Sequence, residues 1–363
     1  MNMNKVLALC LSPDQGGLEL YIIKLLNYYR KNGQNVPIAC SKDSYISKNI
    51  NSNKIECLSH GLFKKIYNFF LIRRFILDNN INIIHVSWAS DLLLSLALKI
   101  FILSDIKIVY YRQMKIPRPK NHFYHRFIYN KIDSVIVITN KLKNEACEYL
   151  PIENKKIHKL TYGIEIPSDN TLINKSDFFS KHNMNPKTFS IGIFSRIEEQ
   201  KGQHLVLNSI SKSKHEIQLF IIGHTIDLKY KDMLEKIAND NKLSSKLKFV
   251  DFVKSPMSYM PCFDLIILPT YEETFGLIVA EAMLMKVPVI GSNAGGVPEI
   301  IKDNQNGLLF ETKNENDLLE KIDSMIDNKK ARDIFVTNAY KFSREQYDYN
   351  KHFIELERII DLI

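Results

Sequence analysis

Short apolar runs rich in β-branched residues alternate with longer amphipathic stretches along the whole chain. This alternation is typical of βα units whose strands form parallel sheets. In the first half the runs predict strands over 5–10, 36–40, 83–86, 108–111 and 134–138. In the second half they predict strands over 189–194, 218–222, 247–250, 265–268, 287–290 and 307–310. The pattern therefore predicts an α/β protein.

Helical spacing of apolar residues marks two helices clearly. One set recurs after the first predicted strand and predicts a helix that packs on the sheet: Leu18, Tyr21, Ile22, Leu25, Leu26 and Tyr29. The last segment, 351–363, carries an apolar stripe of the same kind. Both helices are expected to bury one face.

The length of the chain predicts two domains, because 363 residues exceed what one ordinary core supports. The hydrophobic periodicity lapses after Tyr162-Gly163-Ile164 and through the polar stretch 167–185. We therefore expect two α/β domains that meet at a hinge near residue 165.

The composition is that of a folded protein, with 45% hydrophobic and 25% charged residues. The five cysteines form no CxxC pair and have no nearby histidine, so we expect reduced, mostly buried thiols and neither a zinc site nor a disulfide framework. The first residues lack the arrangement of a signal peptide. The most apolar window, 91–103, is shorter than the roughly 20 residues of a membrane span, so a soluble or peripheral protein is expected.

The charge is uneven along the chain. Residues 1–160 carry 24 Lys and Arg against 11 Asp and Glu, a net charge of +13, whereas residues 161–363 carry −4. The cations include Lys64, Lys65, Arg73, Arg74 and a run over 112–131. This pattern is typical either of an ordinary solvated surface or of attraction to an anionic membrane or a phosphorylated acceptor. Nucleic acid is not expected, because no RNA-binding aromatic signature, zinc finger or helix-turn-helix is recognisable.

Paired acids lie between a buried strand and a helix in the stretch 269–283. We expect the helix to begin near Thr274, which would direct its free N–H groups at a phosphate or a sugar hydroxyl. Glu281 follows Glu273 by roughly 12 Å at about 1.5 Å per helical residue, so the two carboxylates would serve distant parts of an extended ligand. The alternative is a capping acid followed by an ordinary helix-surface glutamate.

A second loop, at the end of the strand 189–194, carries Arg196 and Lys201. Two cations at the carboxyl end of a parallel strand suit a diphosphate leaving group, although a solvent-facing loop with incidental charge has the same pattern. The pairs Gly16-Gly17 and Gly295-Gly296 predict turns where the backbone approaches a ligand closely, or ordinary turns.

Taken in order, these features resemble family 4 of the retaining glycosyltransferases, which have the GT-B architecture. The resemblance covers nearly the whole chain and is sharpest over 190–310, where Gly223, the segment 249–253 and the turn 295–299 add to the two loops. It implies two Rossmann-like domains that face each other across a cleft. The N-terminal domain, 1–165, would take the acceptor and the C-terminal domain, 166–345, the nucleotide sugar. The final helix, 346–363, would cross back to the first domain.

The resemblance also implies the roles of residues. Arg196 and Lys201 would bind the donor diphosphate and, with Glu273, form the catalytic set. Glu273 and the backbone of Phe275 and Gly276 would hold the donor sugar. The donor-binding set comprises Gly17 beside the phosphates, Phe252 and Val253 beside the base, Thr274, Phe275, Gly276 and Leu277 at the sugar, and Glu281 at the ribose.

Two aspartates separated by one residue, the metal-binding device of the other large glycosyltransferase architecture, occur nowhere in the sequence. We therefore expect no metal and no cofactor, with the cations of Arg196 and Lys201 in the place of a metal ion. The resemblance implies a retaining transfer of a hexosyl unit from a UDP- or GDP-linked donor to a glycan or lipid-linked acceptor. The expected setting is bacterial lipopolysaccharide core or O-antigen synthesis, on the cytoplasmic side and peripherally on the inner face of the membrane.

One departure from the family pattern concerns the strand 108–111. Many relatives carry a histidine after this strand, near the donor sugar, whereas Arg112 and Gln113 follow it here. His85 is a possible substitute, or else a core histidine. The departure leaves open a donor-binding scaffold without catalysis, and a nucleotide-sugar epimerase or a phosphorylase is a further alternative. A nicotinamide dehydrogenase is disfavoured because no GxGxxG follows a strand.

Overall fold

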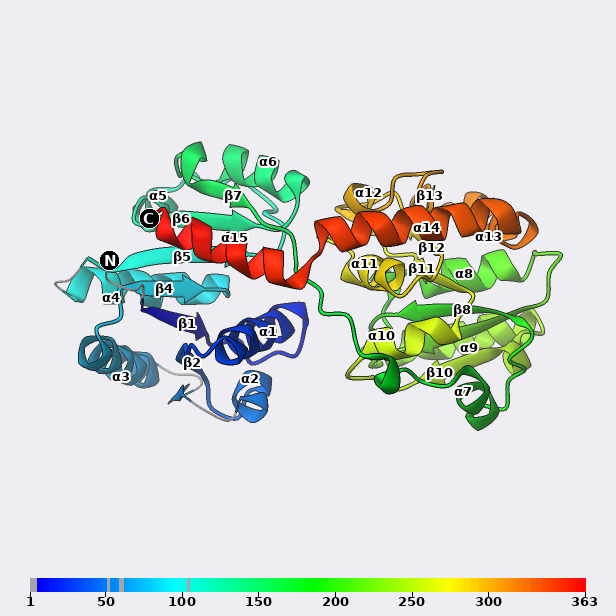
Figure 1. Cartoon of the computed structure of the whole chain (residues 1–363), viewed down its shortest axis with the longest axis horizontal. Coiled ribbons are helices and arrows are strands. Elements are labelled where there is room, and N and C mark those ends of the chain that lie inside the picture. The colour runs from blue at the N-terminus through cyan, green and yellow to red at the C-terminus, as the bar shows by residue number, and fades with distance from the viewer. Residues whose placement is uncertain (1–4, 51–52, 59–61, 103–104) are drawn as a thin grey trace. The chain divides into compact units, whose positions relative to one another are not determined.

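A computed structural model of the chain describes residues 5–50, 53–58, 62–102 and 105–363. It divides the chain into two compact units, the first formed by Met1–Thr161 with Asn350–Ile363 and the second by Tyr162–Tyr349. The sequence placed these boundaries at residues 165 and 345. Each unit is built around one parallel sheet with helices on both faces (Figure 1). This arrangement confirms the predicted α/β class.

The first unit has a seven-stranded sheet in the order β3-β2-β1-β4-β5-β6-β7, in which every pair is parallel. Its strands are β1 (Val6–Cys10), β2 (Ile38–Ser41), β3 (Lys54–Cys57), β4 (Ile83–Val86), β5 (Lys107–Arg112), β6 (Ser134–Val137) and β7 (Ile157–Lys159). The strand order reverses between β1 and β4. The central strands are buried, as expected for a sheet with helices on both faces.

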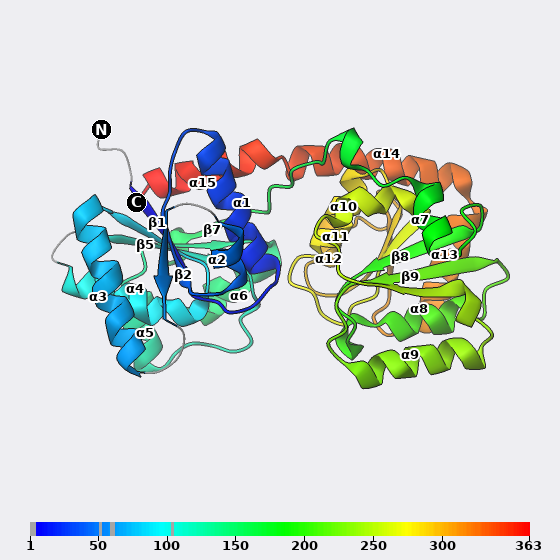
Figure 2. The ribbon, with the colours of Figure 1, turned by 90° about the horizontal axis from the view of Figure 1, so that it is seen from below.

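The helices of the first unit are α1 (Gly17–Lys31), α2 (Tyr45–Asn49), α3 (Leu62–Asn79), α4 (Leu92–Phe101), α5 (Phe123–Tyr129), α6 (Asn140–Tyr149) and α15 (Tyr349–Asp361). Helices α1 and α15 lie on one side of the sheet, and α3, α4 and α5 lie on the other (Figure 2). Helix α15 is held by aromatic packing, since the ring of Phe353 stacks on Tyr28 with centroids 4.2 Å apart.

The second unit has a six-stranded parallel sheet in the order β10-β9-β8-β11-β12-β13. Its strands are β8 (Phe189–Phe194), β9 (Ile217–Ile222), β10 (Leu247–Val250), β11 (Leu265–Leu268), β12 (Val289–Ser292) and β13 (Leu308–Phe310). Its helices are α7 (Lys175–Lys181), α8 (Gln203–Ile210), α9 (Leu228–Asp240), α10 (Pro256–Tyr259), α11 (Leu277–Leu284), α12 (Val297–Ile300), α13 (Glu315–Asp327) and α14 (Lys329–Gln346). The strand order reverses between β8 and β11.

Every strand predicted from the sequence is present within about two residues, and two strands were missed. Strand β3 has only four residues with alternating exposure, and β7 has only three. Both lie at edges of the sheet, where half of a short strand remains polar. Helix α7 was also missed, because it lies in the stretch 167–185, where the hydrophobic periodicity lapses. Two adjacent buried residues, Phe178 and Phe179, anchor this helix.

The cysteines are free, and four of the five are buried, as predicted. Within the described ranges, none of the helices has both the length and the apolar character needed to cross a bilayer.

Candidate functional site

The loops that carry the predicted catalytic residues lie side by side in the second unit. Strands β8 and β11 are hydrogen-bonded neighbours at the point where the strand order reverses. Loops that leave the carboxyl ends of two such strands diverge and create a crevice, which is where open α/β sheets bind ligands. The loop after β8 contains Arg196 and Lys201, and the loop after β11 contains Glu273.

Lys201 and Glu273 form an ion pair across these loops, with Nζ 3.1 Å from Oε2. Their side chains are 18% and 25% exposed, so both remain accessible to a ligand. Arg196 is more exposed, at 57%, and its guanidinium lies 2.8 Å from Oε1 of Glu198. The structure therefore brings Lys201 and Glu273 together and places Arg196 on the same loop as Lys201.

Backbone contacts hold the two loops in register. The amide of Tyr271 donates to the carbonyl oxygen of Gln200 at 2.9 Å, directly before Lys201. Gly202 adopts φ +68°, and a Cβ there would lie 2.2 Å from the carbonyl oxygen of Pro269. Only glycine permits this approach, so the position of Lys201 depends on the backbone of the neighbouring loop.

The turn Gly295-Gly296 packs against the backbone of Glu273 and Thr274. A Cβ on Gly295 would lie 1.7 Å from the carbonyl oxygen of Glu273, and one on Gly296 would lie 2.3 Å from that of Thr274. The amide of Gly296 also donates to the carbonyl oxygen of Glu273 at 2.9 Å. The sequence left open either close approach by a ligand or an ordinary turn, and in the structure these glycines admit another segment of the chain.

Helix α11 begins at Leu277, not near Thr274 as predicted. The residues from Glu273 to Phe275 form an irregular loop that packs on the glycine turn, and Gly276 at φ +100° precedes the helix. The two carboxylates are therefore not on one continuous helix, and the predicted spacing of roughly 12 Å at about 1.5 Å per residue does not apply. Glu281, the fifth residue of α11, is 5% exposed.

Phe275 is buried beside two tyrosines of its own unit. Its ring meets the rings of Tyr162 and Tyr347 edge to face, with centroids 5.0 Å and 5.6 Å away. Burial raises the pKa of the Tyr162 phenol, and the Glu273 carboxylate raises it further. The side chain of Phe275 thus anchors the loop, and its backbone is the part available to a ligand.

Phe252 and Val253 follow β10 at the same edge of the sheet and are half-buried. The Phe252 ring stacks on the imidazole of His224, with centroids 4.6 Å apart and planes 8° apart. His224 follows Gly223, which has φ +152°. Gly223 lies so close to Ser195 that a Cβ on it would be 2.1 Å from the Ser195 carbonyl oxygen. This stacked pair offers a flat ring surface beside the loop that carries Arg196.

The candidate residues of the first unit lie at the carboxyl edge of its sheet. Gly17 begins α1, and a Cβ there would meet nothing within 4 Å, so the space beside it is open. Arg112 ends β5, and its guanidinium donates to the Tyr110 hydroxyl at 2.8 Å and to the Lys115 carbonyl at 2.6 Å. Gln113 is 6% exposed. Arg112 thus binds its own loop.

His85, in β4, lies in a buried aromatic cluster. Within the described part of the chain its Nε2 has no hydrogen-bond partner, and its ring centroid lies 6.0 Å from that of Tyr111. Burial lowers the pKa of His85 to about 4, and nearby His352 lowers it further. At neutral pH the His85 imidazole is therefore uncharged.

Several positioning residues escaped the sequence analysis. Gln203 is fully buried, and its Nε2 donates to Ser195 Oγ at 2.9 Å and to the Arg196 carbonyl at 2.8 Å. His204 bridges the hydroxyls of Tyr230 and Tyr271, each 2.8 Å from a ring nitrogen. The signal available in the sequence was a polar pair, Gln-His, directly after Lys201-Gly202, which forms the start of α8 in the structure.

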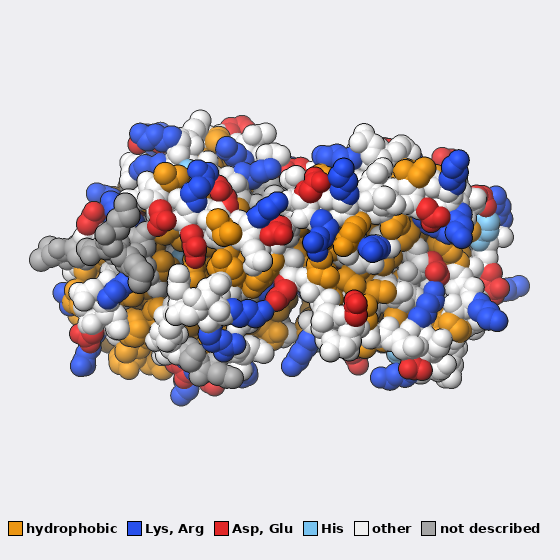
Figure 3. Space-filling view, viewed as in Figure 1, with side chains coloured by type: hydrophobic (Ala, Val, Ile, Leu, Met, Phe, Trp, Pro, Cys, Tyr) orange, Lys and Arg blue, Asp and Glu red, His pale blue; other side chains and the backbone are white. Residues whose placement is uncertain are grey.

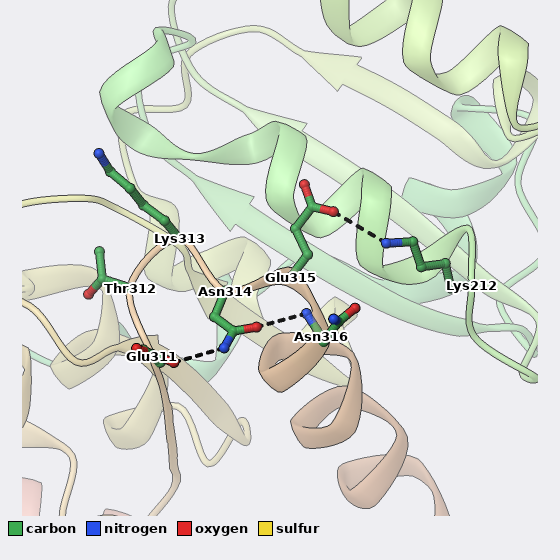
Figure 4. Close-up of a pocket in the computed structure, with 7 residues that line it drawn as sticks. All are labelled: Lys212, Glu311, Thr312, Lys313, Asn314, Glu315 and Asn316. Carbon is green, nitrogen blue, oxygen red and sulfur yellow. Dashed lines mark hydrogen bonds and ion pairs between the residues drawn. The ribbon is translucent and has the colours of Figure 1, made fainter.

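A polar hollow of about 490 Å³ lies at the start of α13 (Figure 4). Its lining consists of Lys212, Glu311, Thr312, Lys313, Asn314, Glu315 and Asn316. The polar groups largely pair with one another: Asn314 caps α13 and donates to Glu311 at 2.8 Å, and Lys212 lies 3.4 Å from Glu315. The hollow is part of a helix cap, separate from the Lys201–Glu273 pair.

Groups of three or more His, Cys, Asp or Glu side chains placed to bind a metal ion are absent from the residues that the structure describes.

Sequence comparisons match both halves of the chain. The model for glycosyl transferases group 1 matches residues 174–342, and the model for Glycosyltransferase Family 4 matches residues 15–166. An uncharacterized glycosyltransferase of Methanocaldococcus jannaschii, MJ1607, is 26% identical over 60% of this chain and 56% of its own length. The Escherichia coli O-antigen biosynthesis glycosyltransferase WclY is 29% identical over 52% of this chain and 50% of its own. The match thus spans little more than half the length of these relatives.

The fold is similar to that of a solved structure, Anabaena Alr3699/HepE in complex with UDP and glucose. The TM-score is 0.84, with 18% sequence identity and coverage of 99% of this chain and 100% of the other. The likeness confirms the predicted GT-B fold.

Proposed function

The chain belongs to family 4 of the glycosyltransferases, and from that membership we propose that it transfers a hexosyl unit from a nucleotide-diphosphate sugar to a glycan or lipid-linked acceptor. The donor is UDP- or GDP-linked, and the product is a bacterial envelope polysaccharide, lipopolysaccharide core or O-antigen. Two likenesses support this choice: WclY is named for O-antigen biosynthesis, and HepE was solved with UDP and glucose.

The observation that carries the proposal is the Lys201–Glu273 pair at the reversal point of the second sheet. The pair offers a cation to a diphosphate and a carboxylate to sugar hydroxyls within one small region. Arg196 adds a second cation from the same loop. Preorganised charges of this kind stabilise the charge that develops when a leaving group departs.

The remaining donor contacts are proposed from the family resemblance. The backbone of Phe275 and Gly276, between Thr274 and Leu277, faces the sugar, and Glu281 binds the ribose. Phe252 and Val253 flank the base, and the family resemblance assigns Gly17 to the phosphates. The bond from the anomeric carbon to the diphosphate breaks, and its electron pair leaves with the diphosphate. The acceptor hydroxyl oxygen attacks the anomeric carbon from the same face, and its proton passes to the departing diphosphate. The configuration is therefore retained.

A donor-binding scaffold without catalysis is the second candidate. Arg112, which binds its own loop, and Gln113 stand where many relatives have a histidine. A scaffold would bind the nucleotide sugar and release no nucleoside diphosphate. The complete set of Arg196, Lys201, Glu273 and Glu281 favours the enzyme, since a scaffold gains little from retaining all four.

A thermal-shift screen of UDP- and GDP-sugars tests donor binding. A donor at about 100 times its Kd is expected to add about 2.7 kcal/mol to the free energy of unfolding. Lys201→Met should abolish the shift, whereas Lys175→Met, a change in an ion pair at the opposite edge of the same sheet, should preserve it. If no nucleotide sugar shifts the wild-type protein, the proposed donor site is wrong.

Metal independence gives a separate test. We expect transfer to be unchanged by a chelator, because the cations of Lys201 and Arg196 neutralise the leaving diphosphate without a metal ion. Transfer is measured before and after dialysis against the chelator. Loss of activity that magnesium or manganese restores would contradict this proposal.

We also propose that the enzyme works on the cytoplasmic side and associates peripherally with the inner face of the membrane. The support is the net charge of +13 on residues 1–160, since a basic surface is attracted to anionic lipid. A lipid-linked acceptor would be reached from that position.

A further inference from the structure

Helix α3 is apolar on two faces, and only one of them packs against the protein. Its buried face includes Ile72 and Ile76, at 0% and 1% exposure. A second stripe, at positions i, i+3, i+4 and i+7, is exposed and consists of Phe63 (87%), Ile66 (48%), Tyr67 (53%) and Phe70 (60%). The solvent-facing side of a helix is normally polar, so an exposed apolar stripe of this kind indicates an interaction surface.

The apolar surface continues over the two neighbouring helices. Helix α4 contacts both α3 and α5, and the ring of Phe101 in α4 lies 6.0 Å from that of Phe69 in α3. Phe101 is 64% exposed, and on α5 Phe123 and Phe127 are 87% and 53% exposed. Of the nineteen large hydrophobic residues exposed in the described part of the chain, eleven lie on α3, α4 and α5.

We call this surface the α3–α5 face and define it by the exposed apolar residues of the three helices. It lies on the side of the first sheet opposite α1 and α15 (Figure 2). Figure 3 shows hydrophobic side chains gathered over α3, at the lower left of the view. The face belongs to one unit and is built from consecutive crossover helices.

Basic residues accompany the aromatic ones. The segment 62–131 contains twelve Lys and Arg but only three Asp and no Glu. Lys64, Lys65 and Arg74 on α3 and Arg126 on α5 are exposed among the apolar side chains. Aromatic and aliphatic groups interspersed with cations are typical of surfaces that lie in the interface of an anionic bilayer.

We propose that the α3–α5 face docks on an anionic lipid bilayer and inserts its aromatic side chains into the headgroup region. The inference rests on the proposed function and deepens it, since it identifies which surface of the first unit meets the membrane. Attraction by charge alone would leave the aromatic residues unexplained, whereas insertion accounts for both sets. The occupant is lipid rather than a second copy, because two-fold pairing would bring two strongly basic faces together.

Nucleic acid fits the face less well than lipid. Tyrosine and phenylalanine can stack on bases, but aliphatic residues cannot. Ile66, Leu77, Leu93 and Ile100 are exposed among the aromatics at 43–52%. Transfer of aliphatic groups from water into lipid is favourable, whereas contact of the same groups with a phosphate backbone is not.

The test is co-sedimentation of the full chain with vesicles of phosphatidylcholine, alone or mixed with phosphatidylglycerol. The wild-type protein should bind the anionic vesicles and retain part of its binding at high salt, because inserted apolar groups are not screened. The variant F63S/F70S/F123S should lower the partition coefficient by at least about tenfold, since each buried phenylalanine contributes favourable transfer free energy. The variant K64Q/K65Q/R74Q should lose binding mainly at low salt and should approach the wild type at high salt, where the charges of both proteins are screened.

A matched control comes from the second unit. Ile226 and Leu228 are 58% and 70% exposed, and I226S/L228S removes comparable apolar surface from outside the α3–α5 face. This variant should bind vesicles like the wild type. All substitutions are at exposed positions, so thermal unfolding curves should remain close to that of the wild type and show that the fold is kept.

A second readout reports insertion directly. An environment-sensitive fluorophore on F70C or F123C, in a C147S background, should shift to the blue with anionic vesicles, while one on L228C should not. Equal binding of the aromatic variant and the wild type, or no shift at either position, would overturn the proposal. A concentration-dependent dimer that the aromatic substitutions abolish, or displacement from vesicles by single-stranded RNA, would assign the face to those partners. Donor turnover with a soluble acceptor is unaffected in every case, so failure here is distinguishable from failure of the proposed function.

Discussion

Replacing Lys201 by methionine is expected to slow transfer by about 100- to 1000-fold, equivalent to about 2.7–4 kcal/mol of lost transition-state stabilisation. The Lys201 side chain is 18% exposed and its ammonium lies 3.1 Å from Glu273 Oε2, so in the complex the other two ammonium protons can face the donor diphosphate. Methionine keeps the length of the side chain and removes the charge. Steady-state kinetics with the donor found by thermal shift would measure the effect.

The same loss is expected for Glu273→Gln. The double variant Lys201→Met/Glu273→Gln shows whether the ion pair only holds the loops together or whether both groups contact the donor. If the ion pair only holds the loops together, each single change leaves one charge unpaired and the double variant recovers activity. If both groups contact the donor, the double variant is no faster than the slower single one, because neither change compensates for the other. Recovery in the double variant would therefore refute the donor-binding assignment.

Lys175→Met provides the matched control. Lys175 Nζ lies 3.0 Å from Oδ1 of Asp264, and both side chains are partly buried, at 33% and 35% exposure, although less so than those of Lys201 and Glu273. Asp264 directly precedes β11, at the amino edge of the sheet, whereas Glu273 follows that strand. The control should alter stability slightly and leave kcat unchanged. A large fall in kcat there would mean that transfer responds to any broken ion pair in this unit.

The sheets were predictable from the sequence because parallel strands buried on both faces read as continuous apolar runs. Strands β8, β10 and β11 were predicted with their observed bounds. The misses are segments where this signal is weak. Strand β3 alternates polar and apolar residues over only four positions, and α7 depends on one adjacent pair of phenylalanines.

The predicted start of α11 was wrong because of a contact with a segment elsewhere in the sequence. Local propensity permits a helix from Thr274, since nothing between Glu273 and Phe275 forbids it. The structure instead packs these residues in an irregular loop against the turn Gly295-Gly296, about twenty residues later in the chain. A contact between segments so far apart leaves no trace in the local pattern.

The positioning residues were unpredictable in the same sense. Gln203 supports Arg196 through a carbonyl oxygen, and His204 links Tyr230 with Tyr271. The Gln203 contact depends on how the connection between β8 and α8 folds back on itself. The His204 contacts require that β9 and β11 flank β8, which follows from the strand order and not from the residues themselves. By contrast, the adjacency of Lys201 and Glu273 was foreseeable through the family resemblance, because both occur in its motifs.

The position of the Glu273 backbone depends on Gly295, and a substitution at this glycine has the second large expected effect on transfer. Gly295→Ala should lower the rate of transfer by about 100-fold, because the turn that contains Gly295 supports the backbone of Glu273. A displacement on the order of 1 Å at a catalytic group lowers the rate by about that factor. A Cβ at this position would lie 1.7 Å from the Glu273 carbonyl oxygen, a backbone atom that can retreat only by moving the loop. The backbone of Gly295 is also in the left-handed region, at φ +61°, which adds about 1–2 kcal/mol of strain to any other residue.

Gly33→Ala separates these two contributions. Gly33 has φ +75°, so alanine meets the same backbone strain, but a Cβ there would have nothing within 4 Å. Both variants should therefore unfold at a lower temperature than the wild type, while only Gly295→Ala should lose transfer when assayed well below its midpoint. If Gly295→Ala folds and retains its rate, the loop tolerates displacement, and Glu273 is not held by the glycine turn in the way the contact implies. If Gly33→Ala loses activity to the same degree, the loss reflects global instability, and the link between Gly295 and the position of the Glu273 carboxylate fails.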